Sequence, residues 1–163
     1  MNRVIVSITA PALFTCLTLA AADAQTAQDM VGTWTLVSAT AEQGGATVET
    51  FGPNPIGTIM FGTDGRYALV FLRRDLPKVA SNNRASQTAE ESKANAQGSI
   101  GHFGTYRVDA SHRSLVFRIE GSTFPNWIGA EQRRPFSLSG DELTYTSPGS
   151  TGVAAQVVVR RAK

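Results

Sequence analysis

Residues 120–134, Glu-Gly-Ser-Thr-Phe-Pro-Asn-Trp-Ile-Gly-Ala-Glu-Gln-Arg-Arg, combine charged, amide and aromatic side chains within a short span. Arg134 can offer a fork of N–H donors to a carboxylate. Gln132 can add a polar contact, Trp127 can supply an aromatic wall with a polar edge, and Glu120 can act as an acid or a base. The stretch therefore predicts either an aromatic turn between two strands or the wall of a binding site.

Strand alternation assigns these side chains to faces. In a strand over residues 132–138, Gln132 and Arg134 share one face with Phe136 and Leu138. A core face rarely carries glutamine and arginine unless they are paired or meet something in a cavity. Two interpretations stay open: Arg134 reaches water at the mouth of the fold while burying its stem, or it meets a ligand.

Glu120 and His102 are the candidates for acid–base chemistry. In a strand over residues 115–120 the odd positions form the apolar face, which sends Glu120 to solvent unless a bulge turns it inward. His102 precedes a strand and can look into the mouth of the fold, whereas His112 lies in a turn. Two separated histidines without a nearby carboxylate predict no metal site. The chain shows no phosphate loop, no nucleophile elbow and no cofactor motif.

Short apolar runs broken by turn residues predict the elements that hold these side chains. Thr63-Asp64-Gly65, for example, is a good hairpin turn. Such runs at regular spacing predict an all-β fold of about eight antiparallel strands, and closing the sheet into an up-and-down barrel removes its sticky edges. The expected strands cover residues 32–38, 57–61, 67–72, 103–108, 115–119, 132–138, 142–146 and 154–160.

Residues 73–101 interrupt this pattern. Thr88 and Glu91 have the spacing of a capping box, the alanines that follow suit a short helix, and Gly98 can end it. We expect one helical insertion in the barrel.

A barrel of about eight strands has room inside for side chains or for one small ligand. We expect Arg160 to pack over Trp34 and close one end. The candidate apolar walls are Met60, Tyr67, Leu69, Phe71, Phe117, Trp127, Phe136 and Tyr145.

The N-terminal residues predict a secretory signal peptide over residues 1–24. A short basic start precedes the largely apolar run from Val4 to Ala22, and Ala22-Asp23-Ala24 has the small-x-small pattern of a cleavage site. Cleavage before Gln25 is expected, with cleavage after Ala22 as the rival and a short membrane anchor as the other interpretation. Cleavage would remove Cys16, the only cysteine, and leave residues 25–163 as a single domain without disulfides or a thiol nucleophile.

The formal net charge of +2 excludes little by itself, but the basic residues are scattered or paired along the chain. A nucleic-acid-binding protein is expected to carry a contiguous basic face. Nucleic acid is therefore not an expected partner.

Several ordered motifs resemble the bacterial and fungal family of lipocalin-like domains, which are calycin-type barrels. The resemblance rests on residues 31–38 (Val-Gly-Thr-Trp-Thr-Leu-Val-Ser), 51–57 (Phe-Gly-Pro-Asn-Pro-Ile-Gly), 64–66, 103–109, 120–129, 132–134 and 140–144. It implies a small-molecule pocket inside the barrel and a Trp34 plug at one end. The family often carries a histidine around 117 or 118, where this chain has Phe117 and Arg118, so histidine chemistry at that place is not implied here.

The resulting hypothesis is an exported, periplasmic or secreted protein that binds a small, mostly apolar molecule with a polar or anionic end. It is not expected to insert stably into a membrane after signal cleavage, and it needs no cofactor and no metal. The alternatives are an isomerase, cyclase or hydrolase using Glu120 or His102 in the same pocket, and a filled barrel that serves as an interaction module. The oligomeric state stays open. The expected ligand-binding residues are Tyr67, Tyr106, Glu120, Trp127, Gln132 and Arg134.

Overall fold

The computed structural model describes residues 25–163, so the predicted signal peptide at residues 1–24 lies outside the described residues. The elements are α1 (Ala27–Met30), β1 (Gly32–Gln43), β2 (Ala46–Glu49), β3 (Ile56–Phe61), β4 (Arg66–Leu72), η1 (Arg84–Ser86), α2 (Ala89–Gln97), β5 (Ser99–Asp109), β6 (Ser114–Ser122), η2 (Pro125–Trp127), β7 (Glu131–Ser139), β8 (Glu142–Ser147) and β9 (Ala155–Arg161).

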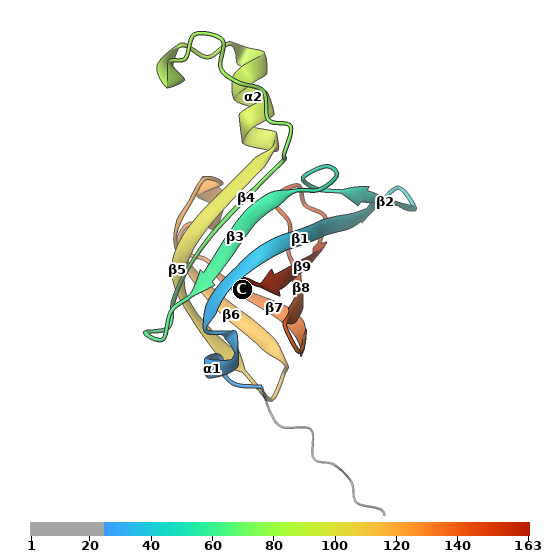
Figure 1. The fold of residues 1–163 in the computed structure, drawn as a ribbon, viewed down its shortest axis with the longest axis vertical. Coiled ribbons are helices and arrows are strands. Elements are labelled where there is room, and N and C mark those ends of the chain that lie inside the picture. The colour runs from blue at the N-terminus through green and yellow to red at the C-terminus, as the bar shows by residue number, and fades with distance from the viewer. Residues whose placement is uncertain (1–24) are drawn as a thin grey trace, which may run out of the picture.

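The strands form a closed antiparallel barrel (Figure 1). β1 pairs with β3, the strands then follow in chain order to β9, and β9 pairs back with β1, for example at Leu36 and Val159. This arrangement confirms the predicted barrel of eight antiparallel strands with one short helical insertion. β2 is an extra short strand that pairs only with the far half of β1, in a segment between the expected strands.

Alternation places the expected faces of β6 and β7 inside the barrel. Phe117 and Ile119 are buried while Arg118 is exposed, and Gln132 and Arg134 are buried while Arg133 is exposed. Side chains of successive strand residues point to opposite faces. The two-residue spacing of the apolar residues was therefore enough to predict which side chains point inward.

A β-bulge lies opposite Gly104, where the pairing skips from Gly121 to Ile119 and leaves Glu120 as the extra residue. The bulge does not turn Glu120 inward. Its carboxylate lies outside and accepts a hydrogen bond from Arg66 at 2.7 Å. A Cβ on Gly104 would collide with the Arg118 carbonyl, so glycine permits the close approach of the two strands.

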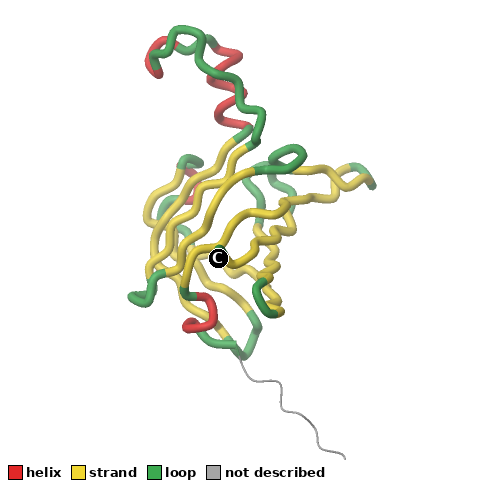
Figure 2. The backbone as a smooth tube through the Cα atoms, viewed as in Figure 1, coloured by secondary structure: helices red, strands yellow, loops and turns green. Residues whose placement is uncertain are grey.

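Loops gather at the two ends of the barrel wall (Figure 2). One end is closed by α1 and by Trp34, which is fully buried and donates from Nε1 to the Met30 carbonyl at 2.8 Å. The prediction that Arg160 covers this ring is wrong, because Arg161 lies over it at 4.2 Å and Arg160 pairs outside with Glu142. Val157, Val159 and Arg161 share the inner parity of β9.

The helical insertion stands away from the barrel, beyond the ends of β4 and β5 (Figure 1). The expected capping box is present: Thr88 Oγ1 accepts from the Glu91 amide at 3.2 Å, and Glu91 Oε2 accepts from the Thr88 amide at 2.9 Å. The helix ends at Gly98 as expected. No residue of α2 is buried, so local bonds rather than core packing hold this helix.

Candidate functional site

Arg134 places its guanidinium inside the barrel. Only 1% of the residue is exposed. Its Nε and Nη2 donate to Gln132 Oε1 at 3.2 and 2.7 Å, and its Cζ lies 4.5 Å from the centre of the Phe117 ring. The side chain is therefore fixed by an amide and an aromatic face rather than reaching water at the mouth.

No carboxylate of residues 25–163 forms an ion pair with Arg134; the arginines that do form ion pairs lie on the outer surface or, for Arg161, at the closed end. Burial lowers the pKa of Arg134, because desolvation penalises the charged form. An arginine nevertheless stays protonated in a protein. Burying a cation without an opposite charge costs on the order of several kcal/mol of folding free energy. Such a cation attracts an anion.

His102 links Arg134 to Tyr67. Arg134 Nη2 lies 3.3 Å from His102 Nε2, and His102 Nδ1 lies 2.8 Å from the Tyr67 hydroxyl oxygen. Arginine can only donate, so Nε2 must accept and the ring proton must sit on Nδ1, which donates to Tyr67. The imidazole is thus neutral, and its free lone pair is already used by the guanidinium.

Burial, and then the charge of Arg134, lower the pKa of His102 from 6.5 to about 3. In the unfolded chain His102 takes up a proton below pH 6.5, whereas the folded protein does not until about pH 3. The unfolded state binds more protons in this window, so the stability that is present above pH 6.5 is lost as the pH falls.

We therefore expect the free energy of unfolding to drop by about 2 kcal/mol between pH 7 and pH 5 because of His102. Urea denaturation at the two pH values measures this drop. In H102Q the drop should shrink by the same amount, because glutamine does not titrate. An undiminished drop in H102Q would assign the pH dependence to other groups.

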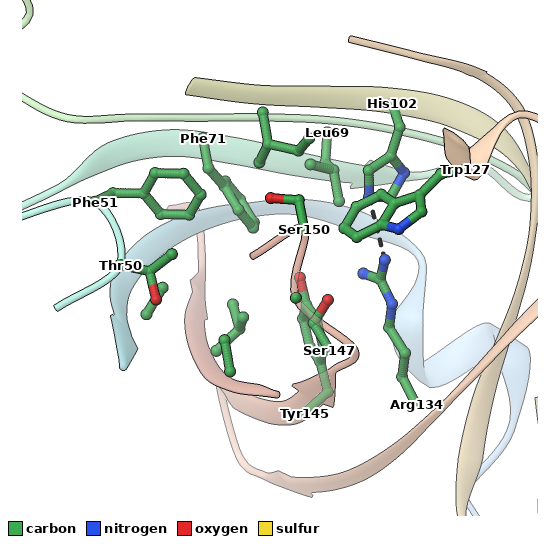
Figure 3. A pocket seen from close by; sticks show the side chains of 15 residues that line it. Thr50, Phe51, Leu69, Phe71, His102, Trp127, Arg134, Tyr145, Ser147 and Ser150 are labelled. Carbon is green, nitrogen blue, oxygen red and sulfur yellow. Dashed lines mark hydrogen bonds between the residues drawn. The ribbon is translucent and has the colours of Figure 1, made fainter. Parts of the chain in front are cut away.

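The guanidinium faces a cavity inside the barrel (Figure 3). The cavity leaves about 410 Å³ between its lining atoms when its open mouth is included, and about 40 Å³ of this space admits the centre of a water molecule. Its apolar wall consists of Ala39, Phe51, Leu69, Phe71, Ile100, Trp127, Ala155 and Val157, and its other lining residues are Thr50, His102, Arg134, Tyr145, Ser147, Gly149 and Ser150. The arrangement is a mostly apolar space with one cation on its wall.

Trp127 covers the guanidinium from the β6–β7 connection. It lies in η2, half-buried, with its ring centre 5.6 Å from that of His102 and 5.9 Å from Arg134 Cζ. Phe124 packs edge-on against it at 5.6 Å. The aromatic stretch that connects the two strands therefore folds back over the core, and Trp127 is the residue through which it joins the cavity wall.

The structure brings together four of the six predicted site residues: Tyr67, Trp127, Gln132 and Arg134. Glu120 lies outside the barrel in its ion pair with Arg66. Tyr106 lies at the closed end, where its hydroxyl donates to the Gly62 carbonyl at 3.0 Å. Of the six, only Trp127 and Arg134 line the cavity itself, whereas Tyr67 and Gln132 connect to it through their hydrogen bonds to His102 and Arg134.

The expected apolar wall is partly in place. Leu69, Phe71, Trp127 and Tyr145 line the cavity, and Tyr67, Phe117 and Phe136 are buried in the core. Met60 was assigned wrongly, because it points outward and is 49% exposed.

Thr50, Phe51, Ile100 and Ser147 line the cavity although the sequence did not single them out. Ile100 and Ser147 lie at strand ends, where alternation can be extended to include them. Thr50 and Phe51 lie in the connection after β2. Outside a strand, the alternation of side chains cannot predict which of them points inward.

No group of three or more metal-ligating side chains occurs among residues 25–163. None of the helices in this part of the chain is long and apolar enough to span a bilayer.

Comparison with known proteins gives one family match. A family model described as a lipocalin-like domain matches residues 31–157. No curated protein matches the chain significantly. The matched range includes every residue that lines the cavity.

Proposed function

The chain belongs to the family of lipocalin-like domains, and from this premise we propose that it binds a small, mostly apolar molecule whose anionic end lies against Arg134. The observation that carries the proposal is the buried guanidinium, 1% exposed, with no carboxylate partner among the described residues. A ligand carboxylate would supply the missing charge.

The bonds of Arg134 leave room for such a ligand. Nε and Nη2 both donate to Gln132, and Nη2 also reaches His102, whereas Nη1 has no hydrogen-bond partner within residues 25–163. A carboxylate can accept from Nη1 and compete with Gln132 for Nη2, which would give the two parallel bonds of an arginine–carboxylate pair.

The apolar wall supports a hydrocarbon body for the ligand. Burial of an apolar surface contributes about 25 cal/mol per Å² before the costs of association. The space that admits a water centre is only about 40 Å³, so a ligand longer than a few atoms must displace side chains at the mouth. Ser150 is exposed and Trp127 half-buried, and both lie in connections between strands.

Binding is favoured over acid–base catalysis by the positions of the two proton carriers. Glu120 lies on the outer face. His102 faces the cavity, but its Nε2 accepts from Arg134 and its pKa of about 3 makes it a weak base at neutral pH.

Export is part of the proposal and is supported by the N-terminal residues. The apolar run from Val4 to Ala22 and the Ala22-Asp23-Ala24 pattern fit a cleaved signal peptide and a periplasmic or secreted location. Sequencing the N-terminus of the protein recovered after expression in its host would test this, since a mature chain that still begins at Met1 contradicts cleavage.

A head-group series tests the proposed ligand class. We expect hexanoate, octanoate or decanoate to bind, and the alkylamine of the same length to bind at least about tenfold more weakly, because an ammonium would face the guanidinium. Isothermal titration calorimetry and native mass spectrometry measure both ligands, with the uncharged alcohol as a control for chain burial. Absence of binding by every acid, or equal binding of the amine, would overturn the proposal.

A further inference from the structure

Two buried hydroxyl groups in residues 25–163 make no hydrogen bond of good geometry: Thr50 Oγ1, and Tyr145 Oη, which lies close to the Arg134 guanidinium. They are the only side-chain nitrogen or oxygen atoms of this part of the chain that are both fully shielded from solvent and without a partner. Thr50 and Tyr145 come from distant parts of the chain, yet both line the cavity that Arg134 faces. Buried polar groups are normally bonded, and those that are not call for an explanation.

The two hydroxyl-bearing residues occupy different parts of the cavity. Figure 3 shows Thr50 and Arg134 on opposite sides, with Phe51 and Phe71 on the Thr50 side. Tyr145 belongs to the Arg134 side, because its ring centre lies 5.6 Å from the guanidinium carbon. The cavity therefore has two polar places separated by an apolar wall.

The local structure holds Thr50 in the cavity wall. Its amide donates to the Ala39 carbonyl at 2.8 Å, and the adjacent Phe51 is buried with its ring edge-on to Phe71 at 6.3 Å. Gly52 follows with a φ of +64°, which favours glycine and turns the chain away. With the backbone fixed on both sides, the Thr50 side chain stays in the cavity wall.

An unbonded hydroxyl in such a place lowers the stability of the empty protein. Valine has nearly the same shape as threonine and would remove that cost, since replacing an unsatisfied polar group by an apolar one is neutral or stabilising. A hydroxyl that costs stability in the empty protein is explained if a bound molecule completes its bonding.

We propose that the ligand carries two polar groups, a carboxylate at Arg134 and Tyr145 and a hydroxyl or carbonyl oxygen at Thr50, joined by an apolar stretch. The chemical class is an ω-hydroxy or ω-oxo carboxylic acid. A threonine hydroxyl can donate and accept, so it suits either oxygen. The inference rests on the proposed function, which requires only the carboxylate and the apolar body.

An apolar pocket is expected to prefer the plain acid to the hydroxy acid, and a contact with Thr50 would reverse this preference. A hydroxyl buried against hydrocarbon alone weakens binding, because it loses its bonds to water. A hydroxyl that meets Thr50 gains a bond and satisfies an orphaned group, so it strengthens binding.

The test compares each plain acid with its ω-hydroxy derivative over hexanoate, octanoate and decanoate, by calorimetry. For at least one length, the hydroxy acid should bind the wild-type protein about tenfold more tightly than the plain acid. This preference should disappear in T50V and persist in T146V, which carries the same substitution at an exposed position of β8. The empty T50V protein should melt at the same temperature as the wild type or higher.

The outcomes separate the two claims. If plain acids bind and no hydroxy acid is preferred at any length, or if T50V keeps the preference, the second polar contact is wrong while the proposed function stands. If T50V melts below the wild type, the hydroxyl has a structural role and the inference fails. If no acid of either kind binds, the proposed function falls and this inference falls with it.

Discussion

Replacing Arg134 by methionine should weaken octanoate binding by about 100-fold, or about 2.8 kcal/mol, while the barrel stays folded. The loss follows from removing the buried cation at the end of an apolar cavity, since truncating one partner of a desolvated charge pair costs about 2–5 kcal/mol. Methionine keeps much of the stem that packs on Phe117. Calorimetry with octanoate measures the affinity.

The stability of the R134M variant should move in the opposite direction to its affinity. The empty protein no longer holds an unpaired buried charge, and exchanging such a charge for an apolar side chain is often neutral or stabilising. The expected free energy of unfolding is therefore equal to or above that of the wild type. Loss of the bond to Gln132 offsets part of the gain.

Two further variants test whether the loss of affinity depends on the position of the arginine and on the fork of its guanidinium. R118M makes the same change on the exposed face of β6 and should leave the affinity unchanged. R134K keeps the charge but loses the fork, so its affinity should fall between those of R134M and the wild type. An R134M protein that binds octanoate as the wild type does would show that the cation is not the head-group site.

Strand alternation predicted the part of the site that depends only on which face a side chain occupies. Gln132 and Arg134 were assigned correctly because β7 alternates buried and exposed residues from Glu131 to Ser137, and Phe117 because the bulge in β6 comes only after it. β1 shows the limit of this argument. A register shift between Leu36 and Ser38 moves its inner positions from Trp34 and Leu36 to Ala39, and no local signal in the sequence indicates that shift.

Depth along the barrel could not be predicted. Tyr106 has an inward parity, as expected, but it lies beside Phe61 and Gly62 at the closed end rather than near Arg134. The height of a residue depends on the register between strands, which is set by contacts between residues far apart in the chain. The position of Thr50 depends in the same way on a loop that is folded by its neighbours.

Replacing Trp34 by alanine should lower the free energy of unfolding by about 4 kcal/mol. The ring is fully buried, donates to the Met30 carbonyl at 2.8 Å, and carries the Arg161 guanidinium at 4.2 Å. Alanine would leave a cavity at the closed end and would leave the Met30 carbonyl and the stacked guanidinium without their partner. Urea denaturation at pH 7 measures the change, and W34F, which keeps a ring but loses the N–H donor, should cost less.

The matched control for this prediction is Trp127, the other tryptophan, at the open end. Trp127 is half-buried and lies in a short connection, so W127A should cost less stability than W34A but should weaken octanoate binding, because the ring covers Arg134. A W34A protein no less stable than W127A would show that Trp34 does not close the barrel. Substitution of Trp34 should thus mainly lower stability, and substitution of Trp127 should mainly weaken binding. The closed end of the barrel must stay packed, whereas side chains at the open end must move to admit a ligand.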